Sequence, residues 1–198
     1  MHEPGESPFH VRGSRYLGIR EHVATTVPGG VEALLEALPT GALRDFCAQR
    51  FAAKEWYDAL PIRPITELVA KLEGRAWEDS IRARAQDFAR LELGLLRRLK
   101  MKLSSPEKVV EQLERAALDN FNFGESEIVE IGPGRSQVVF HEVPQPLGSW
   151  FLPTMAGYAG VLIERAGGKK PVVNGRLIPK GQRDAIGLVD VRVNLTWV

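Results

Sequence analysis

The sequence predicts an α+β fold, in which a helical first half precedes a small, mostly antiparallel sheet. Up to about residue 120, apolar residues recur every three or four positions, as on amphipathic helices. From about residue 121 they alternate with polar residues, as in half-buried strands. One apolar helix divides the strands, so the second half has the order β-β-α-β-β. Helices segregated from strands in this way are typical of α+β domains.

The length of 198 residues suits one domain. Residues 1–12 are predicted to be a flexible leader, because they are polar, contain Pro4 and Pro8, and lack the apolar core of a signal peptide. Residues 13–198 are the predicted domain, helical over about 13–120 and sheet-forming over about 121–198. A single cysteine is usual in a reducing compartment, so we expect a cytoplasmic protein.

The helical half contains clear stop and start signals. Pro28-Gly29-Gly30 ends a first helix, and Pro39 ends a second. Ser105 followed by Pro106 is a typical helix start. The apolar spacing predicts helices over these ranges: 14–27, 31–38, 40–51, 65–72, 77–103 and 106–120. Residues 56–61 are expected to form a connector rich in aromatic side chains.

The second half begins with two predicted strands, 127–131 and 136–141, joined by a hairpin turn at Gly132-Pro133-Gly134. Two more strands are expected at 171–178 and 186–197, with a polar turn at 180–182. Residues 143–163 carry no charge, but three prolines interrupt them. We therefore interpret this stretch as a loop followed by a buried helix, with no membrane span.

The charge pattern argues against a nucleic-acid partner. The formal net charge is +1, which gives no general attraction to polyanions. Four cations lie within residues 97–102, at the end of a predicted helix. Cations are favourable at a helix C-terminus, and no aromatic residues are interleaved with them. The basic run is therefore interpreted as a solvated helix end rather than as a phosphate or nucleic-acid site.

No catalytic or metal site is predicted. Cys47 is the only cysteine and is expected to be a buried thiol. The four histidines lack metal-ligand spacing, and His22 is expected on the exposed side of its helix. His141 and Glu142 could form a base and its orienting acid. Adjacent strand residues point to opposite faces, however, and no nucleophile accompanies them, so an enzyme is the least favoured reading.

The predicted helix that starts near Pro153 is apolar around most of its circumference, so it should be buried on nearly all sides. It carries two glycines, Gly157 and Gly160, which disfavour a helix. They would allow either close packing on the sheet or room for an apolar ligand, and a dimer contact is a third reading. The candidate ligand-binding residues near this helix are Trp150, Phe151, Met155 and Tyr158.

Several segments resemble a known superfamily, which unites haem-nitric-oxide-binding, Bet3-like and four-vinyl-reductase-type ligand-binding domains. The resemblance is carried by residues 120–135 and 138–143, with smaller matches at 11–14 and 59–61. Within the superfamily, the chain is most similar to a myxobacterial paralogous family of uncharacterised domains of about this length. The resemblance implies the same element order and an apolar cavity beside the late helix.

Haem-binding members carry a Tyr-x-Ser-x-Arg motif and an axial histidine on a helix. This chain lacks the motif, and it has no histidine between His22 and His141, so no haem and no other cofactor is expected. One cysteine cannot supply the zinc cluster of other members. We therefore expect a non-enzymatic sensory or regulatory domain with a small apolar ligand between the helix and the sheet. The alternative is a homodimeric interaction or scaffold module without a small-molecule ligand.

Overall fold

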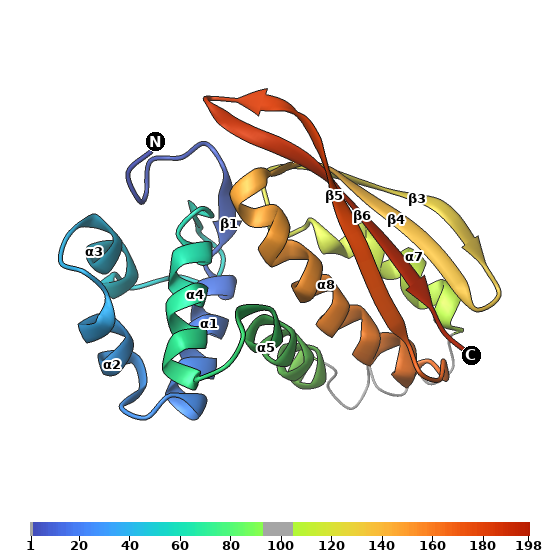
Figure 1. Cartoon of the computed structure of the whole chain (residues 1–198), viewed down its shortest axis with the longest axis horizontal. Coiled ribbons are helices and arrows are strands. Elements are labelled where there is room, and N and C mark those ends of the chain that lie inside the picture. The colour runs from blue at the N-terminus through green and yellow to red at the C-terminus, as the bar shows by residue number, and fades with distance from the viewer. Residues whose placement is uncertain (1, 93–104) are drawn as a thin grey trace.

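The computed structural model describes residues 2–92 and 105–198. It confirms the α+β class: helices gather on one side of the molecule and a four-stranded sheet lies on the other (Figure 1). The basic run at 97–102 and the end of the helix predicted over 77–103 lie outside the described residues. In the part of the chain that is described, no helix is long and apolar enough to cross a membrane.

The helical half follows the predicted apolar spacing closely. Its helices have these bounds: α1 (Ser14–Thr26), α2 (Gly30–Ala37), α3 (Ala42–Ala48), α4 (Ile62–Glu73), α5 (Trp77–Glu92) and α7 (Pro106–Ala117). Gly74 ends α4 with a φ of 66°, a left-handed conformation that glycine adopts without strain. Helix α5 lies between α4 and the sheet half, so it connects the two layers (Figure 1).

Part of the predicted leader packs into the fold. Phe9 is fully buried, and β1 (His10–Arg12) pairs with β2 (Trp56–Asp58), where a connector was predicted. The buried carboxylate of Asp58 accepts hydrogen bonds from the backbone N–H of Gly5 (2.9 Å) and from the hydroxyl of Ser7 (2.5 Å). The segment therefore contributes to the core, because Asp58 satisfies polar groups that would otherwise be buried without a partner.

The antiparallel sheet has the strand order β3-β4-β6-β5, and its strands are β3 (Glu125–Gly132), β4 (Arg135–Pro144), β5 (Val172–Arg183) and β6 (Ile186–Thr196). Gly134, with a φ of 75°, makes the predicted turn between β3 and β4. The turn predicted at 180–182 is wrong. Strand β5 continues through a bulge there, and the chain reverses at Asp184 and Ala185, whose φ angles are 50° and 62°.

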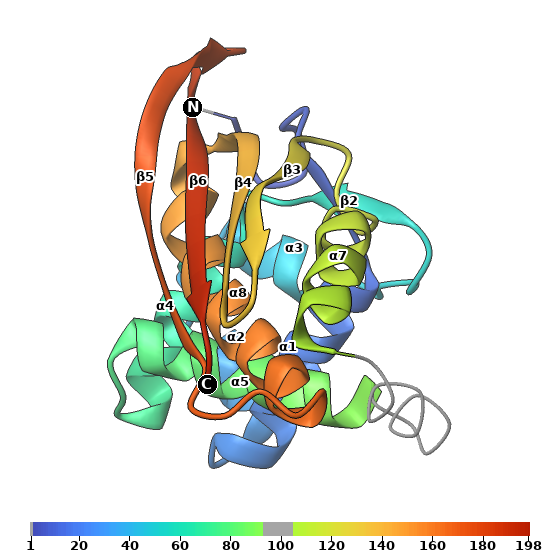
Figure 2. The ribbon, with the colours of Figure 1, turned by 90° about the vertical axis from the view of Figure 1, so that its right-hand side faces the viewer.

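Helix α8 (Gln145–Arg165) begins well before the predicted start. Pro146 lies in its first turn, where a missing N–H costs nothing, and the helix tolerates Pro153 in its interior. The prediction of a loop before Pro153 is therefore wrong, and Trp150 and Phe151 are helical. Helix α8 covers one face of the sheet along its length, with α5 on the other side of α8 (Figures 1 and 2).

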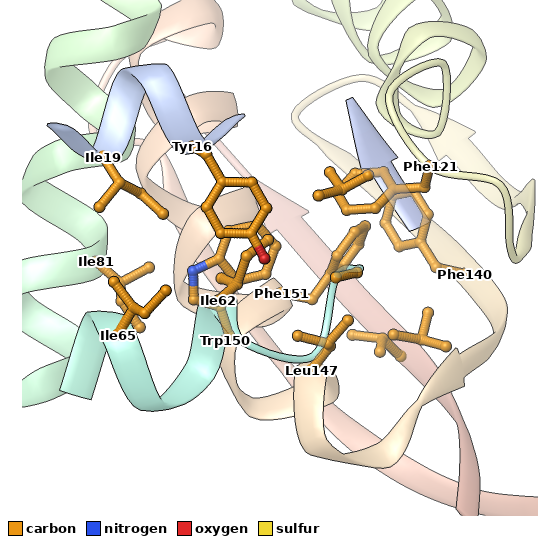
Figure 3. Close-up of a cluster of buried hydrophobic side chains, with 14 of the residues drawn as sticks. Tyr16, Ile19, Ile62, Ile65, Ile81, Phe121, Phe140, Leu147, Trp150 and Phe151 are labelled. Carbon is orange, nitrogen blue, oxygen red and sulfur yellow. The ribbon is translucent and has the colours of Figure 1, made fainter. Parts of the chain in front are cut away.

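One continuous core joins the helical half to the sheet through α8. Figure 3 shows Trp150 on the side of α8 that faces Ile62 and Ile81, whereas Phe151 lies beside Phe121 and Phe140. Helix α7 adds a second, smaller apolar cluster with α5 and α8, made by Ala89, Val109, Val161 and Leu162. Helix α8 is thus the element that every layer contacts, and it positions the candidate site.

Candidate ligand site beside helix α8

The structure divides the four predicted ligand-binding residues between two sides of α8. Phe151 is fully buried and faces the sheet. Its ring centroid lies 4.9 Å from that of Phe140 on β4 and 5.8 Å from that of Phe121, both in edge-to-face geometry. Such pairs stabilise a core beyond their buried area. On the sheet side of α8, Phe151 is therefore a packing residue.

Trp150 and Tyr158 face α5 instead. The Tyr158 ring lies 6.2 Å from the ring of Phe88 on α5, and both side chains are half-buried. Trp150 is only 3% exposed, and its indole Nε1 is buried without a hydrogen-bond partner. An unpaired buried donor is costly and uncommon. We call Phe88, Trp150 and Tyr158, together with Arg84 beside them, the aromatic seam between α5 and α8.

Met155 lies between these two sides, half-buried against the main core. A methionine side chain is flexible and adapts to irregular surroundings. The contacts described for Met155 are with the main core, so its place in the candidate site rests on its position on α8 alone.

The two glycines of α8 have different surroundings. A Cβ atom on Gly157 would lie 2.4 Å from the carbonyl oxygen of Arg82 and 2.9 Å from Cβ of Ala85, both on α5. A Cβ atom on Gly160 would meet nothing within 4 Å. Gly157 therefore serves close packing, as the leading interpretation held, although its partner is α5 rather than the sheet. Gly148, at the start of α8, provides the close approach to Val189 on the sheet.

Arg84 on α5 is a site residue that the sequence interpretation missed. Its guanidinium carbon lies 6.0 Å from the centroid of the Trp150 ring. Burial, with the charge of Arg15 as a second cause, lowers the pKa of Arg84 to about 10, although Glu73 acts in the opposite direction. Arg84 is three residues after Ile81 and four before Phe88, so its position on the apolar face could have been found from the spacing.

Arg84 belongs to a wider group of charges between α1, α4 and α5. His22 Nε2 lies 2.6 Å from Glu73 Oε1, and the two side chains are 6% and 2% exposed. Burial would raise the pKa of Glu73, but hydrogen bonds from Ser80, Thr26 and His22 and the charge of His22 outweigh it and lower the pKa. The prediction that His22 is exposed is wrong, because its helix turns it toward the C-terminal end of α4.

His141 and Glu142, the candidate base and its orienting acid, contact different partners. His141 Nδ1 lies 3.2 Å from Asp190 Oδ2 on β6, whereas Glu142 forms a 2.9 Å ion pair with Arg183. A bulge in β4 and a φ of 52° at Glu142 separate the two side chains. Burial opposes ionisation of Asp190, yet hydrogen bonds from Glu142 N–H, His141 and Lys180 lower its pKa. His141 is therefore paired with Asp190, and Glu142 does not orient it.

Possible metal ligands are dispersed over the described residues. In residues 2–92 and 105–198, no three histidine, cysteine, aspartate or glutamate side chains gather as a metal site would require. Cys47 is buried, as predicted, and burial raises the pKa of its thiol despite the opposing charge of Arg20. A raised thiol pKa disfavours the reactive thiolate, which fits a packing role.

Comparison with known proteins shows similarity in structure but not in sequence. No protein-family model and no curated protein matches this chain. The structure resembles the Fe(II) unliganded H-NOX protein from K. algicida, with a TM-score of 0.64 and 9% identity over 94% of this chain and 96% of that one. A point mutant of the T. Tengcongensis H-NOX has a TM-score of 0.51 and 11% identity, over 94% and 97% of the two chains. A structure from work on heme distortion in the H-NOX family has a TM-score of 0.53, with 12% identity over 93% and 92%.

The expectation of no haem is contradicted by these neighbours, because this chain has the fold of domains whose solved structures are described with iron or heme. The donor chemistry of the aromatic seam tests the fit of such a group. The described residues of the seam offer aromatic rings and a guanidinium, and the four histidines contact other groups: Asp184, Asn122, Glu73 and Asp190. The seam thus does not fit a histidine-ligated haem. The myxobacterial family stays a prediction, and the comparisons show that this chain has the H-NOX fold.

Proposed function

We propose that this protein is a ligand-sensing or regulatory domain that binds a small apolar molecule along the aromatic seam between α5 and α8. The observation that carries the proposal is the placement of aromatic side chains along the contact of α5 and α8: the half-buried pair of Phe88 and Tyr158, and the buried Trp150 eight residues before Tyr158. Aromatic walls with few polar groups are typical of small-molecule sites. The H-NOX fold, whose solved examples are described with iron or heme, supports a role in sensing a bound molecule.

The place of the site in the fold supports a regulatory role. Helix α8 contacts the sheet on one side and α5 on the other, and α5 also contacts α1 and α4. A ligand that separates α5 from α8 would therefore change the relation between the helical layer and the sheet. A ligand can shift the equilibrium between two such arrangements only by the difference between its binding free energies for them.

Isothermal titration calorimetry with decanol, a neutral apolar probe, tests this proposal. We expect saturable binding with a negative heat-capacity change, which marks burial of apolar surface. Replacing Tyr158 with alanine should weaken binding by roughly tenfold or more, since burial of one ring contributes about 1.5–3 kcal/mol. The control is Trp56→Ala, which removes an exposed ring on β2. Absence of saturable binding to the wild type would rule out the proposal.

The homodimeric scaffold remains the second candidate, and one observation favours it. Both edge strands of the sheet carry exposed apolar side chains: Val129 (50% exposed) on β3 and Val172 (53% exposed) on β5. Exposed apolar residues on edge strands favour pairing with another strand. Sedimentation equilibrium tests this candidate: a dimer that Val172→Lys dissociates would favour it, and a monomer at all concentrations would exclude it.

A further inference from the structure

We infer that the ligand of the aromatic seam is an anionic amphiphile, whose acidic head group, a carboxylate or similar oxyanion, pairs with Arg84 while its apolar part lies against Phe88, Trp150 and Tyr158. This inference rests on the proposed function and specifies the chemistry of the ligand. It depends on how Arg84 is placed, on what surrounds it, and on what the protein leaves unpaired beside it.

Arg84 lies at the contact of three helices. It stands between Ile81 and Phe88 in the sequence, on the face of α5 that packs against α1 and α8. The residue as a whole is half-buried, and burial of its guanidinium lowers the pKa of that group. The charge of Arg84 is therefore set back from bulk water, at the contact between α5 and α8. A guanidinium on the open surface would keep its ordinary pKa.

The second step concerns the anions that the protein itself could supply. Among the described residues, Arg84 has no hydrogen bond and no ion pair within 4 Å, and its guanidinium lies over the Trp150 ring. Glu73 is the nearby acid, and its Oε1 already accepts hydrogen bonds from His22 (2.6 Å) and Thr26 (2.9 Å). The charge of Glu73 acts on Arg84, but no hydrogen bond joins the two side chains among the described residues, so the guanidinium donors of Arg84 stay unused.

The third step is the local balance of charge. Arg15 on α1 is close enough to lower the pKa of Arg84, and its guanidinium carbon lies 5.1 Å from the Phe88 ring. Two guanidiniums thus flank the same seam from two helices. Arginine is suited to planar oxyanions, because its donors match a carboxylate in pairs. The unpartnered indole Nε1 of Trp150 adds a further buried donor in the seam.

Alternatives explain the arrangement less well. A surface arginine needs no partner, but Arg84 is desolvated, and a desolvated charge without a partner destabilises the fold. The aromatic contact recovers part of that cost, since a cation over a ring contributes about 0.5–2 kcal/mol. Without a ligand, the charge of Arg84 therefore destabilises the protein. An anion bound in the aromatic seam would compensate that charge, and this is why we assign Arg84 to anion binding.

The experiment compares two probes that differ only in the head group, decanoate and decanol, on the full chain at neutral pH. We expect the wild type to bind decanoate about 10–100-fold more tightly, as charge-assisted hydrogen bonds allow. Arg84→Met should remove this preference while keeping the affinity for decanol. Arg84→Lys should keep part of it, because the charge remains but the paired donors are lost. The control is Arg90→Met on the same helix, whose side chain is 53% exposed. Circular dichroism checks that each variant is folded.

The outcomes separate the inference from the function on which it rests. Saturable binding of both probes with equal affinity would keep the proposed function and overturn the anionic head group. A preference for decanoate that persists in Arg84→Met would overturn the assignment to Arg84. Binding of neither probe to the wild type would remove the proposed function itself, and the inference with it. A preference lost in Arg84→Met and kept in Arg90→Met would support both.

Discussion

Replacing Gly157 with alanine tests the packing of α8 on α5, because it adds a single methyl group where the two helices touch. The added Cβ would lie 2.4 Å from the carbonyl oxygen of Arg82, which is backbone and cannot turn away. It would also lie 2.9 Å from Cβ of Ala85, on the next part of the same helix. Relief of both contacts requires α5 and α8 to move apart, because no flexible side chain can yield.

The expected magnitude follows from two opposing effects. An alanine in a helix is favoured over glycine by about 1 kcal/mol. Overpacking a tight contact costs about 1–3 kcal/mol, and a clash with backbone belongs at the upper end of that range. We therefore expect Gly157→Ala to lower the free energy of unfolding by about 1–2 kcal/mol. Gly160→Ala, one turn away with nothing within 4 Å, should raise it by about 0.5–1 kcal/mol.

Urea unfolding followed by circular dichroism measures both variants, because a changed midpoint with an unchanged slope reports a change in stability. The two substitutions are chemically identical and lie on the same helix, so helix propensity cancels between them. The packing argument would be refuted by equal stabilisation of the two variants. Stabilisation by Gly157→Ala alone would contradict the position of α5 as well.

Three further changes test other parts of the structure. Arg84→Met should raise the free energy of unfolding by about 1–3 kcal/mol at neutral pH, because the fold disfavours the charged guanidinium and lowers the pKa of Arg84 to about 10. Equal or lower stability in urea unfolding would show that the protein itself stabilises the charge of Arg84 without a ligand. The pKa of Glu73 is lowered in the folded protein, so its ionised form stabilises the fold above the ordinary carboxyl pKa, and this stability is lost as the pH falls through the folded pKa. Glu73→Gln should therefore flatten the acid side of the plot of unfolding free energy against pH. An unchanged plot would contradict the pairing of Glu73 with His22. Asp58→Ala should cost about 2–4 kcal/mol because it leaves the donors of Ser7 and Leu60 unpaired, and a loss below 1 kcal/mol would mean that residues 5–9 are not held by Asp58.

Much of the fold followed from local patterns. The change from helical to alternating spacing near residue 120 marks where the helices end and β3 begins at Glu125. The turn at Gly132-Pro133-Gly134 was predicted from its glycines and proline between two strand patterns, and Gly134 takes a positive φ there. The turn at Asp184-Ala185 was missed, since neither residue is typical of such a turn and a more usual Lys-Gly sequence precedes it.

Helix α8 shows why a rule about proline can mislead. Three prolines between residues 143 and 153 suggested a loop, but one precedes the helix, one occupies its first turn, and one is tolerated inside it. Tertiary packing decides here, because α8 is enclosed by α5 on one side and the sheet on the other. The residues of the segment itself do not show which elements will pack around it, so the helix could not be predicted from them alone.

The candidate site was partly predictable. Trp150 and Tyr158 were chosen for their apolar helix, and the structure places both against α5. Phe151 was chosen for the same reason but packs on the sheet, because the faces of an all-apolar helix cannot be told apart from its sequence. Arg84 and His22 were missed because charged residues were assumed to be exposed, although both lie on apolar stripes.

The central claim is that an apolar ligand lies in the aromatic seam, and the indole N–H of Trp150 reports on it directly. A two-dimensional ¹H–¹⁵N spectrum shows the indole groups of the four tryptophans, and Trp150→Phe assigns the signal of interest. The Trp77 indole already donates to Thr66 at 3.1 Å, whereas that of Trp150 has no partner. On addition of decanol, we predict that the Trp150 signal shifts with saturation while those of Trp56, Trp77 and Trp197 stay in place. A Trp150 signal that stays fixed while decanol binds the protein would place the ligand elsewhere and contradict the account.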